Sequence, residues 1–211
     1  DGPANVACLY IGIFLDDAEM VNDAIAYYKT GKGGGCITEG IVFGGQPVEM
    51  GRDQPHAAIG IDAYADLCQA LWNQGLDMYA YEDNLLLKGF EYYAKFNLEH
   101  PVDWTPIDYH GHKFYYPAPS NNAPSSMPNN RILANEAVYH HYVDRKGLDA
   151  PYLRTMMKLK NVDVLTGMMY TYSDTTTAYV SYPVPPVPED VKVTGSIGRI
   201  DLDWASVEGD V

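Results

Sequence analysis

The residues best suited to acid–base chemistry lie where a glycine-rich stretch gives way to a helical pattern. His56 falls at the start of a helix predicted over 55–73, where free backbone amides favour anions. His56 could therefore bind a carboxylate of a ligand. If the preceding turn is already helical, Arg52 lies one turn earlier and could bind the same ligand carboxylate through two hydrogen bonds. The alternative is purely structural. In it, Arg52 pairs with Glu49 or Asp53, and His56 caps the helix.

Two histidine pairs suggest metal ligands, but no third ligand with a helpful spacing accompanies them. His110 and His112 alternate, as two ligands on a strand would. His140 and His141 are adjacent and would point about 100° apart on a helix. The glycines at 31–35 lack the preceding strand and the Gly-Lys-Ser/Thr ending of a phosphate-binding loop. The sequence therefore predicts no metal ion and no cofactor.

The composition predicts a folded, acidic protein. Of the 211 residues, 46% are hydrophobic and 20% charged, which is enough to bury a core. Lys and Arg number 14 against 28 Asp and Glu, and the net charge of −14 argues against nucleic acid or an anionic membrane as a partner. The three cysteines have no metal-binding spacing, and an odd number cannot all pair internally. The 18 tyrosines suit a groove that stacks on sugars.

Helical periodicity dominates the first 160 residues. Apolar positions predict helices over 5–29, with a break at Asp16 and Asp17, and over 55–73 and 79–98. Gly75 ends the second of these, so the helices at 55–73 and 79–98 must lie antiparallel. Further helices are predicted over 131–145 and 150–160. Residues 36–51 are expected to form an ordered loop with at most brief strands, and 100–130 a surface loop.

The C-terminal part has a different pattern. Prolines at 183, 185, 186 and 188 predict a stiff linker over 183–190. Beyond it, 191–193 and 200–204 alternate in the manner of strands around a turn at 195–198. The predicted organisation is therefore a helical domain at 1–182, a linker at 183–190 and a β-rich module at 191–211.

Five segments carry a resemblance to a known family. They are EMGRDQPH at 49–56, ALWNQG at 70–75, NLLLKGFEY at 84–92, AKFNL at 94–98 and YHHYVDRKG at 139–147. In this order and spacing, residues 5–182 resemble the alginate-lyase-like polysaccharide lyases. The resemblance implies a mainly α fold: the C-terminal part of an (α/α) toroid, here an incomplete toroid of antiparallel helix pairs, followed by a short β-rich segment. That last segment resembles the opening strands of a fibronectin type III module.

The resemblance implies cleavage of a polyuronate, such as alginate or glucuronan, by β-elimination. This reaction needs a neutralised C6 carboxylate, an acceptor for the C5 proton and a donor for the departing oxygen. The family resemblance implies Asn5 and His56 as neutralisers and a tyrosine as base, acid or both. Tyr109 is the first candidate, because its loop follows the paired helices and could fold over the groove. Tyr115, Tyr116 and Tyr139 remain open.

Other residues are expected to contact the substrate. Glu49 either orients His56 or is a solvated loop residue, and a helix-capping role explains Asn5 equally well. Because the net charge opposes binding of a polyanion, Arg52 and His56, with Lys113 or Arg131, must create a local positive cleft. The predicted substrate-binding residues are Arg52, Glu49, Gln54, Tyr115, Tyr139 and Arg131.

Two other functions stay open. One is a non-catalytic carbohydrate-binding or scaffold protein that retains the toroid. The other is a glycoside hydrolase, which needs two carboxylates about 5–9.5 Å apart across a groove and could draw on Glu49, Asp53 and Asp108. The lyase prediction brings with it a secreted or extracellular location and an acidic polysaccharide as partner. It involves no nucleic acid and no membrane, and it leaves open association with the missing remainder of the same domain.

Overall fold

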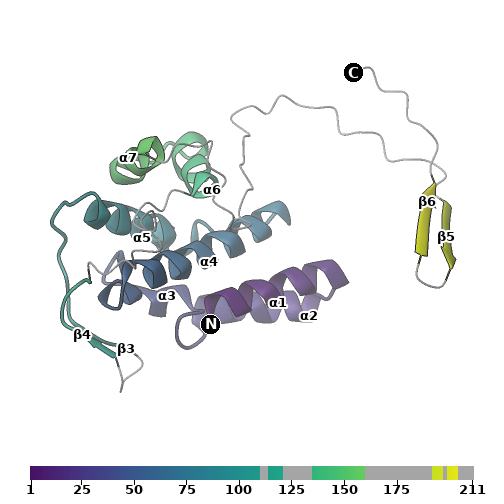
Figure 1. The fold of residues 1–211 in the computed structure, drawn as a ribbon, viewed down its shortest axis with the longest axis horizontal. Helices are drawn as coiled ribbons and strands as arrows, with labels where there is room; N and C mark the ends of the chain where they lie inside the picture. The colour runs from purple at the N-terminus through teal and green to yellow at the C-terminus, as the bar shows by residue number, and fades with distance from the viewer. Residues whose placement is uncertain (110–113, 121–134, 160–191, 197–198, 204–211) are drawn as a thin grey trace. The chain divides into compact units, whose positions relative to one another are not determined.

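The computed structural model describes residues 1–109, 114–120, 135–159, 192–196 and 199–203 (Figure 1). Within these residues the fold is mainly helical, as predicted, and the strands form two-stranded antiparallel sheets. None of the described helices is both long enough and apolar enough to cross a membrane. The chain divides into two compact units, Asp1–Asp174 and Thr175–Val211. The predicted linker at 183–190 lies outside the described residues and stays a prediction.

The first two helices form a hairpin that breaks where the sequence predicts. α1 spans Gly2–Leu15 and α2 spans Ala18–Thr30. Asp16 ends α1 in the left-handed conformation, with φ of 55°, which aspartate tolerates better than most residues. The Asp17 carboxylate then accepts a hydrogen bond of 3.0 Å from the Met20 N–H and caps α2. The two helices lie side by side (Figure 1).

Short elements fill the glycine-rich segment that follows, as expected for an ordered loop with brief strands. They are α3 (Ile37–Gly40), β1 (Ile41–Val42), β2 (Gln46–Pro47) and the 3₁₀ turn η1 (Val48–Gly51). β1 and β2 pair through a tight turn in which Gly44 and Gly45 have positive φ. η1 leads directly into α4, so its charged residues lie at the start of that helix.

Two long helices supply much of the core. α4 spans Gln54–Asn73 and α5 spans Tyr81–Asn97, close to the predicted ranges, and α5 turns back beside α4 (Figure 1). Gly75 has φ of 85° and ends α4, as predicted. Residues 82–84 have left-handed backbone angles, so the regular part of α5 begins at Leu85. The fully buried side chains of this helix pair include Ile61, Leu67, Leu71, Leu86 and Phe90.

The prediction of a surface loop over 100–130 is wrong for the described part of this segment, which contains a hairpin. β3 (Ile107–Tyr109) pairs with β4 (Phe114–Tyr116), with Ile107 opposite Tyr116. Tyr116 is buried in a small apolar cluster with Val48 and Ile107. Strands of three residues are too short to show a period of two in the sequence, so packing against η1 rather than local pattern defines the hairpin.

The remaining elements of the first unit are helical. α6 (Glu136–Tyr139) continues as a π-helical turn, η2 (His140–Arg145), and α7 spans Pro151–Leu159. α7 agrees with the predicted start at Pro151. The helix predicted over 131–145 is present from Glu136, and 131–134 lie outside the described residues. Asn135 caps α6 by accepting from the Val138 N–H at 3.1 Å.

The second unit contains one described hairpin. β5 (Lys192–Ser196) and β6 (Arg199–Asp203) pair antiparallel, with Ser196 opposite Arg199. This confirms the two strands that the alternating pattern predicts. Their place in a fibronectin type III module stays a prediction.

A carboxylic acid within α4 makes the stability of the fold depend on pH. Burial, with Asp62 one helical turn earlier as a second cause, raises the pKa of Asp66 to about 8. The native state therefore keeps a proton that the unfolded chain releases above about pH 4, and the free energy of unfolding falls as the pH rises from there to about 8.

We expect Asp66→Asn to raise the free energy of unfolding by about 1–3 kcal/mol at pH 8 and to change it little at pH 4, because the amide keeps the shape but cannot ionise. Urea titrations at the two pH values measure this difference. The exposed Asp103, changed to Asn, provides the control. Equal effects of Asp66→Asn at both pH values would contradict the assignment.

Candidate functional site

A pocket of about 240 Å³ lies where η1 and the first turns of α4 meet the start of α1. Three of the residues predicted from the sequence line it: Glu49, Arg52 and His56. Asp1 also reaches the pocket, and most of the remaining lining is small or apolar. The charged groups are therefore gathered in a partly enclosed setting, in which their interactions with a ligand are stronger than in open water.

Asp53 and His56 form a carboxylate–imidazole pair at the start of α4. Asp53 is the N-cap, and its Oδ1 accepts from the His56 N–H at 2.8 Å. The same carboxylate lies 2.7 and 2.8 Å from Nδ1 of the His56 ring. Because an ionised carboxylate only accepts hydrogen bonds, Nδ1 holds a proton. Nε2 is then a proton acceptor in the neutral ring and a donor in the charged ring.

The exposures of these two side chains differ in a way that suits a positioned histidine. The His56 side chain is 42% exposed, whereas that of Asp53 is 19% exposed. The orienting carboxylate is thus largely covered while the imidazole stays accessible. The expectation that Glu49 orients His56 is not what the structure shows, because Asp53 occupies that position. An aspartate three residues before a histidine at a helix start is the sequence signal for it.

Arg52 lies between two carboxylates without a hydrogen bond to either. Its Nη1 is 3.9 Å from Oε2 of Glu49, and its Nε is 3.9 Å from Oδ2 of Asp53. Both distances are longer than a hydrogen bond. Within the part of the chain that the structure describes, the guanidinium therefore donates no hydrogen bond to these two carboxylates, and its directional donors are left for a ligand. The side chain is 46% exposed, so a ligand can reach it.

Glu49 offers an unsatisfied acceptor beside this arginine. Its Oε2 is buried and has no hydrogen-bond partner within the part of the chain that the structure describes. A buried carboxylate oxygen without a donor is costly, by about 1–3 kcal/mol or more. Glu49 and Arg52 line one pocket, so a carboxylate acceptor and a guanidinium donor lie together, a pairing that suits a ligand carrying both hydroxyls and a carboxylate.

The β3–β4 hairpin brings Tyr116 against η1. A Cβ at Gly51 would overlap the Cβ of Tyr116, so the tyrosine packs directly on this glycine. The indole N–H of Trp104 donates to the carbonyl of Tyr116 at 3.1 Å and fixes its backbone. Burial raises the pKa of Tyr116, and Glu49 raises it further, while Arg52 lowers it. Tyr116 is therefore a buried phenol within electrostatic reach of the charged pocket residues.

Gln54 has a structural role rather than contact with the pocket. It is completely buried, and its Nε2 donates to the Ser120 carbonyl at 2.7 Å. Its Oε1 accepts from Nδ2 of Asn97 at 2.8 Å. Both ends of the amide are thus used to join the start of α4 to α5 and to the segment after β4. The predicted contact of Gln54 with substrate is corrected accordingly.

Asn5 is not brought together with His56. Its side chain is buried and donates from Nδ2 to the Ala24 carbonyl at 3.0 Å, which ties α1 to α2. It lines a different groove, described below, and it does not cap α1, because the N-cap is Asp1. The structure therefore gives Asn5 an interhelical role in place of both alternatives considered from the sequence.

The other predicted residues lie away from the pocket or outside the described part. Tyr115 is exposed on β4, and Tyr139 packs against the main core on α6. A hydrogen bond to Tyr139 raises the pKa of Arg154, so this tyrosine already has a cationic partner. Tyr109 ends β3, but its side chain is outside the described residues, as are Lys113 and Arg131. Their roles stay predictions.

Comparison with protein-family models, curated proteins and solved structures finds no match to this chain. Among the described residues, no group of three or more His, Cys, Asp or Glu side chains could hold a metal ion.

Proposed function

We propose that this chain belongs to a polysaccharide lyase that cleaves a polyuronate of the alginate or glucuronan type by β-elimination. One observation carries the proposal: a single pocket holds an arginine with unused donors next to a histidine whose Nδ1 is fixed by a carboxylate. The resemblance of segments 49–56, 70–75, 84–92, 94–98 and 139–147 to these lyases supports the same function. The helix pairs α1–α2 and α4–α5 agree with a place in an incomplete (α/α) toroid.

The first requirement is neutralisation of the C6 carboxylate, which makes the C5 proton acidic. In our proposal Arg52 meets it, because its planar guanidinium can donate two hydrogen bonds to one carboxylate. The carboxylate of Glu49, which lines the same pocket, accepts a hydrogen bond from a sugar hydroxyl. This arrangement supplies the local positive site that an acidic chain needs for an acidic substrate.

The second requirement is a base for the C5 proton. Neutral His56 presents a lone pair at Nε2, and the Asp53 carboxylate stabilises the imidazolium that forms. This assignment differs from the neutralising role that the resemblance implies for His56. It also leaves Tyr109 as an alternative base whose side chain lies outside the described residues.

The third requirement is a proton for the departing oxygen. As the C5–H bond breaks, its electron pair forms the C4–C5 double bond, the C4–O4 bond breaks and O4 takes up a proton. We assign this step to Tyr116, because a phenol carries its proton at neutral pH and Tyr116 lies within electrostatic reach of Glu49 and Arg52. Its raised pKa leaves little phenolate at neutral pH, so Tyr116 is not assigned as the base.

One observation favours the alternative of a non-catalytic carbohydrate-binding protein. Arg52 already has two carboxylates at 3.9 Å, which offset its charge and weaken its attraction for a uronate. The two functions differ in their products. A lyase incubated with alginate or glucuronan generates a C4–C5 double bond conjugated with the carboxylate, which absorbs in the ultraviolet. A binding protein is retained on the polymer without any rise in absorbance.

The Asp53–His56 pair predicts a specific effect of Asp53→Asn. Asparagine caps a helix as well as aspartate does, so the melting temperature should change little. The amide can donate to Nδ1 and so select the tautomer that carries its proton on Nε2, which removes the base. We expect turnover to fall by at least about 100-fold, the lower end of the range for losing a positioned base.

The pH profile tells the two roles of His56 apart. If His56 is the base, wild-type kcat/KM rises with pH as the ring loses its charge. If charged His56 instead neutralises the C6 carboxylate of the substrate, kcat/KM falls with rising pH. An unchanged turnover of Asp53→Asn, together with a wild-type pH profile, would remove Asp53 from the mechanism.

The remaining features of the proposal follow from the substrate. A polymeric polyuronate lies outside cells, so we propose a secreted or extracellular location. The β5–β6 hairpin is proposed as the start of a fibronectin type III-like module that follows the lyase domain.

A further inference from the structure

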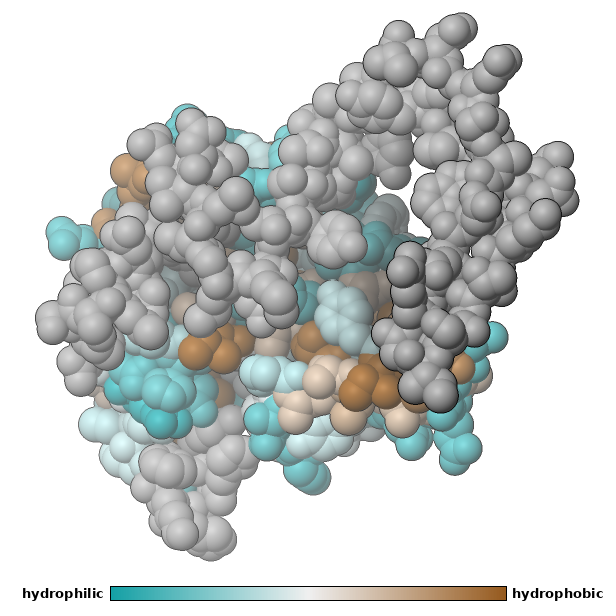
Figure 2. All heavy atoms as spheres, turned by 45° about the vertical axis from the view of Figure 1, so that its right-hand side comes forward, coloured by the Kyte–Doolittle hydropathy of each residue, from teal (hydrophilic) through white to brown (hydrophobic). Residues whose placement is uncertain are grey.

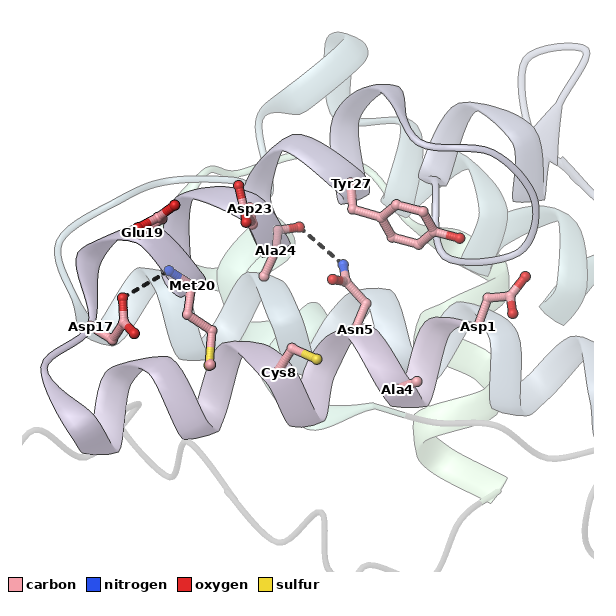
Figure 3. Close-up of a pocket in the computed structure, with 10 residues that line it drawn as sticks. All are labelled: Asp1, Ala4, Asn5, Cys8, Asp17, Glu19, Met20, Asp23, Ala24 and Tyr27. Atoms are coloured by element: carbon pink, nitrogen blue, oxygen red, sulfur yellow. Dashed lines mark hydrogen bonds between the residues drawn. The ribbon is translucent and has the colours of Figure 1, made fainter.

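A second and larger hollow lies between α1 and α2. It has a volume of about 620 Å³. Its floor consists of small and apolar side chains, mainly Ala4 and Cys8 from α1 and Met20 and Ala24 from α2. Figure 3 shows Cys8 and Met20 between the two helices, with Asp17 at one end of the groove and Asp1 at the other.

The groove continues into an exposed apolar face of α1. Phe14 is 87% exposed, and Leu15 and Ile11 are at least half exposed. From Gly2 to Leu15 the helix contains no charged residue. Ala4, Cys8, Ile11 and Leu15 follow one another at intervals of three and four, so they form one stripe along the helix. A helix that is apolar on nearly all sides is normally covered.

Hydrophobic residues also gather into a patch bordered by hydrophilic ones on the face shown in Figure 2. A patch of this kind on a water-soluble surface usually marks an interaction site. The small side chains Ala4 and Cys8, one turn apart, allow another backbone to approach α1 closely, as a helix packed into the groove requires.

The rim of the groove has one sign of charge. Asp17, Glu19 and Asp23 of α2 border it, and no Lys, Arg or His occurs among its described lining residues. Figure 3 places Glu19 and Asp23 along the α2 side, above the apolar floor. An apolar floor with an acidic rim is complementary to a helix that is apolar on one face and basic on its flanks.

We infer that the α1–α2 groove binds a basic amphipathic helix of a partner protein. The apolar face of that helix covers the stripe on α1 together with the exposed Phe14, which neighbours Ile11 on the helix surface. Its Lys or Arg side chains pair with Asp17, Glu19 and Asp23. A second copy of this chain fits less well, because it would bring two acidic rims together. An anionic membrane surface would be repelled by the same carboxylates. This inference is independent of the proposed lyase activity.

Cys8 makes the inference directly testable. It is exposed in the floor of the groove, whereas Cys36 and Cys68 are buried, so a thiol reagent reports on the groove alone. The probe is an 18-residue designed helix with leucines on one face and lysines on the flanks. We expect it to bind, as measured by fluorescence anisotropy, and to slow modification of Cys8 by at least about tenfold at saturation.

Matched variants and peptides locate the binding. Phe14→Ser should weaken binding by about tenfold or more, and so should the double variant Glu19→Gln with Asp23→Asn. Leu76→Ser, at another exposed leucine, should not. A peptide with glutamates in place of the lysines should bind at least about tenfold more weakly than the lysine peptide.

Three results would overturn the inference. The first is equal binding of the lysine and glutamate peptides. The second is an unchanged rate of Cys8 modification at peptide saturation. The third is self-association of the protein that Phe14→Ser abolishes, which would assign the groove to a second copy. Far-ultraviolet circular dichroism of each variant verifies that the helices are intact, so loss of binding is read only from folded protein.

Discussion

Turnover on a soluble oligouronate is expected to fall by about 10²–10⁴ when Tyr116 is replaced by Phe. The phenyl ring keeps the packing on Gly51 and in the Val48 cluster, so the fold and the substrate affinity should change little. The loss that bears on catalysis is the proton donated to the departing oxygen, an interaction that exists only in the transition state. Separate measurement of kcat and of binding by titration tests this split.

The leaving group gives a sharper test of the same residue. When C4 carries an aryloxy group, O4 leaves as an aryloxide that needs no proton, so Tyr116→Phe should retain near wild-type turnover on a 4-O-aryl uronate. Tyr115→Phe, on the exposed neighbour, serves as the control and should have wild-type activity on both substrates. If Tyr109→Phe lowers turnover while Tyr116→Phe does not, the essential tyrosine is Tyr109.

Replacing His56 with Ala is expected to lower turnover on polyuronate by at least about 100-fold, with an unchanged fold. The helix cap survives, because Asp53 accepts from the backbone N–H of residue 56 and not only from the ring. An exogenous base of the same chemistry, free imidazole, should restore part of the lost activity. A substrate with an aryloxide leaving group should not restore the activity of His56→Ala, because this variant is impaired in removing the C5 proton.

Ile59 offers a matched control for His56. It lines the same pocket and is also partly exposed, but it has no titratable group. Ile59→Ala should therefore alter binding at most, with kcat close to wild type. Wild-type turnover of His56→Ala at an unchanged melting temperature would remove His56 from the mechanism.

Much of the helical fold could be predicted because its signals are local. The Asp16–Asp17 break, the Gly75 stop and the Pro151 start each act within one turn of a helix, and all three are found in the structure. The β3–β4 hairpin could not be predicted in this way. Its strands are three residues long, and it is held by contacts between Tyr116 and Gly51, which are far apart in the sequence.

The candidate site also combines residues that local signals predict with residues whose roles depend on long-range contacts. Arg52 and His56 could be predicted from the sequence because they flank a helix start. Both line the pocket. Asp53 could have been recognised from its N-cap position three residues before His56. The interhelical role of Asn5 and the burial of Gln54 could not, since they depend on Ala24, Asn97 and Ser120.

The mass balance of cleavage tests the central claim most directly. A purified polyuronate oligomer of defined length is incubated with the protein, and the masses of the products are measured by mass spectrometry. β-Elimination adds no water across the broken bond, so the masses of the two products should sum to the mass of the substrate, and the same oligomer with its carboxylates reduced to alcohols should stay intact. Products whose summed mass exceeds the substrate by one water, or an oligouronate that is bound but never cleaved, would contradict the lyase account.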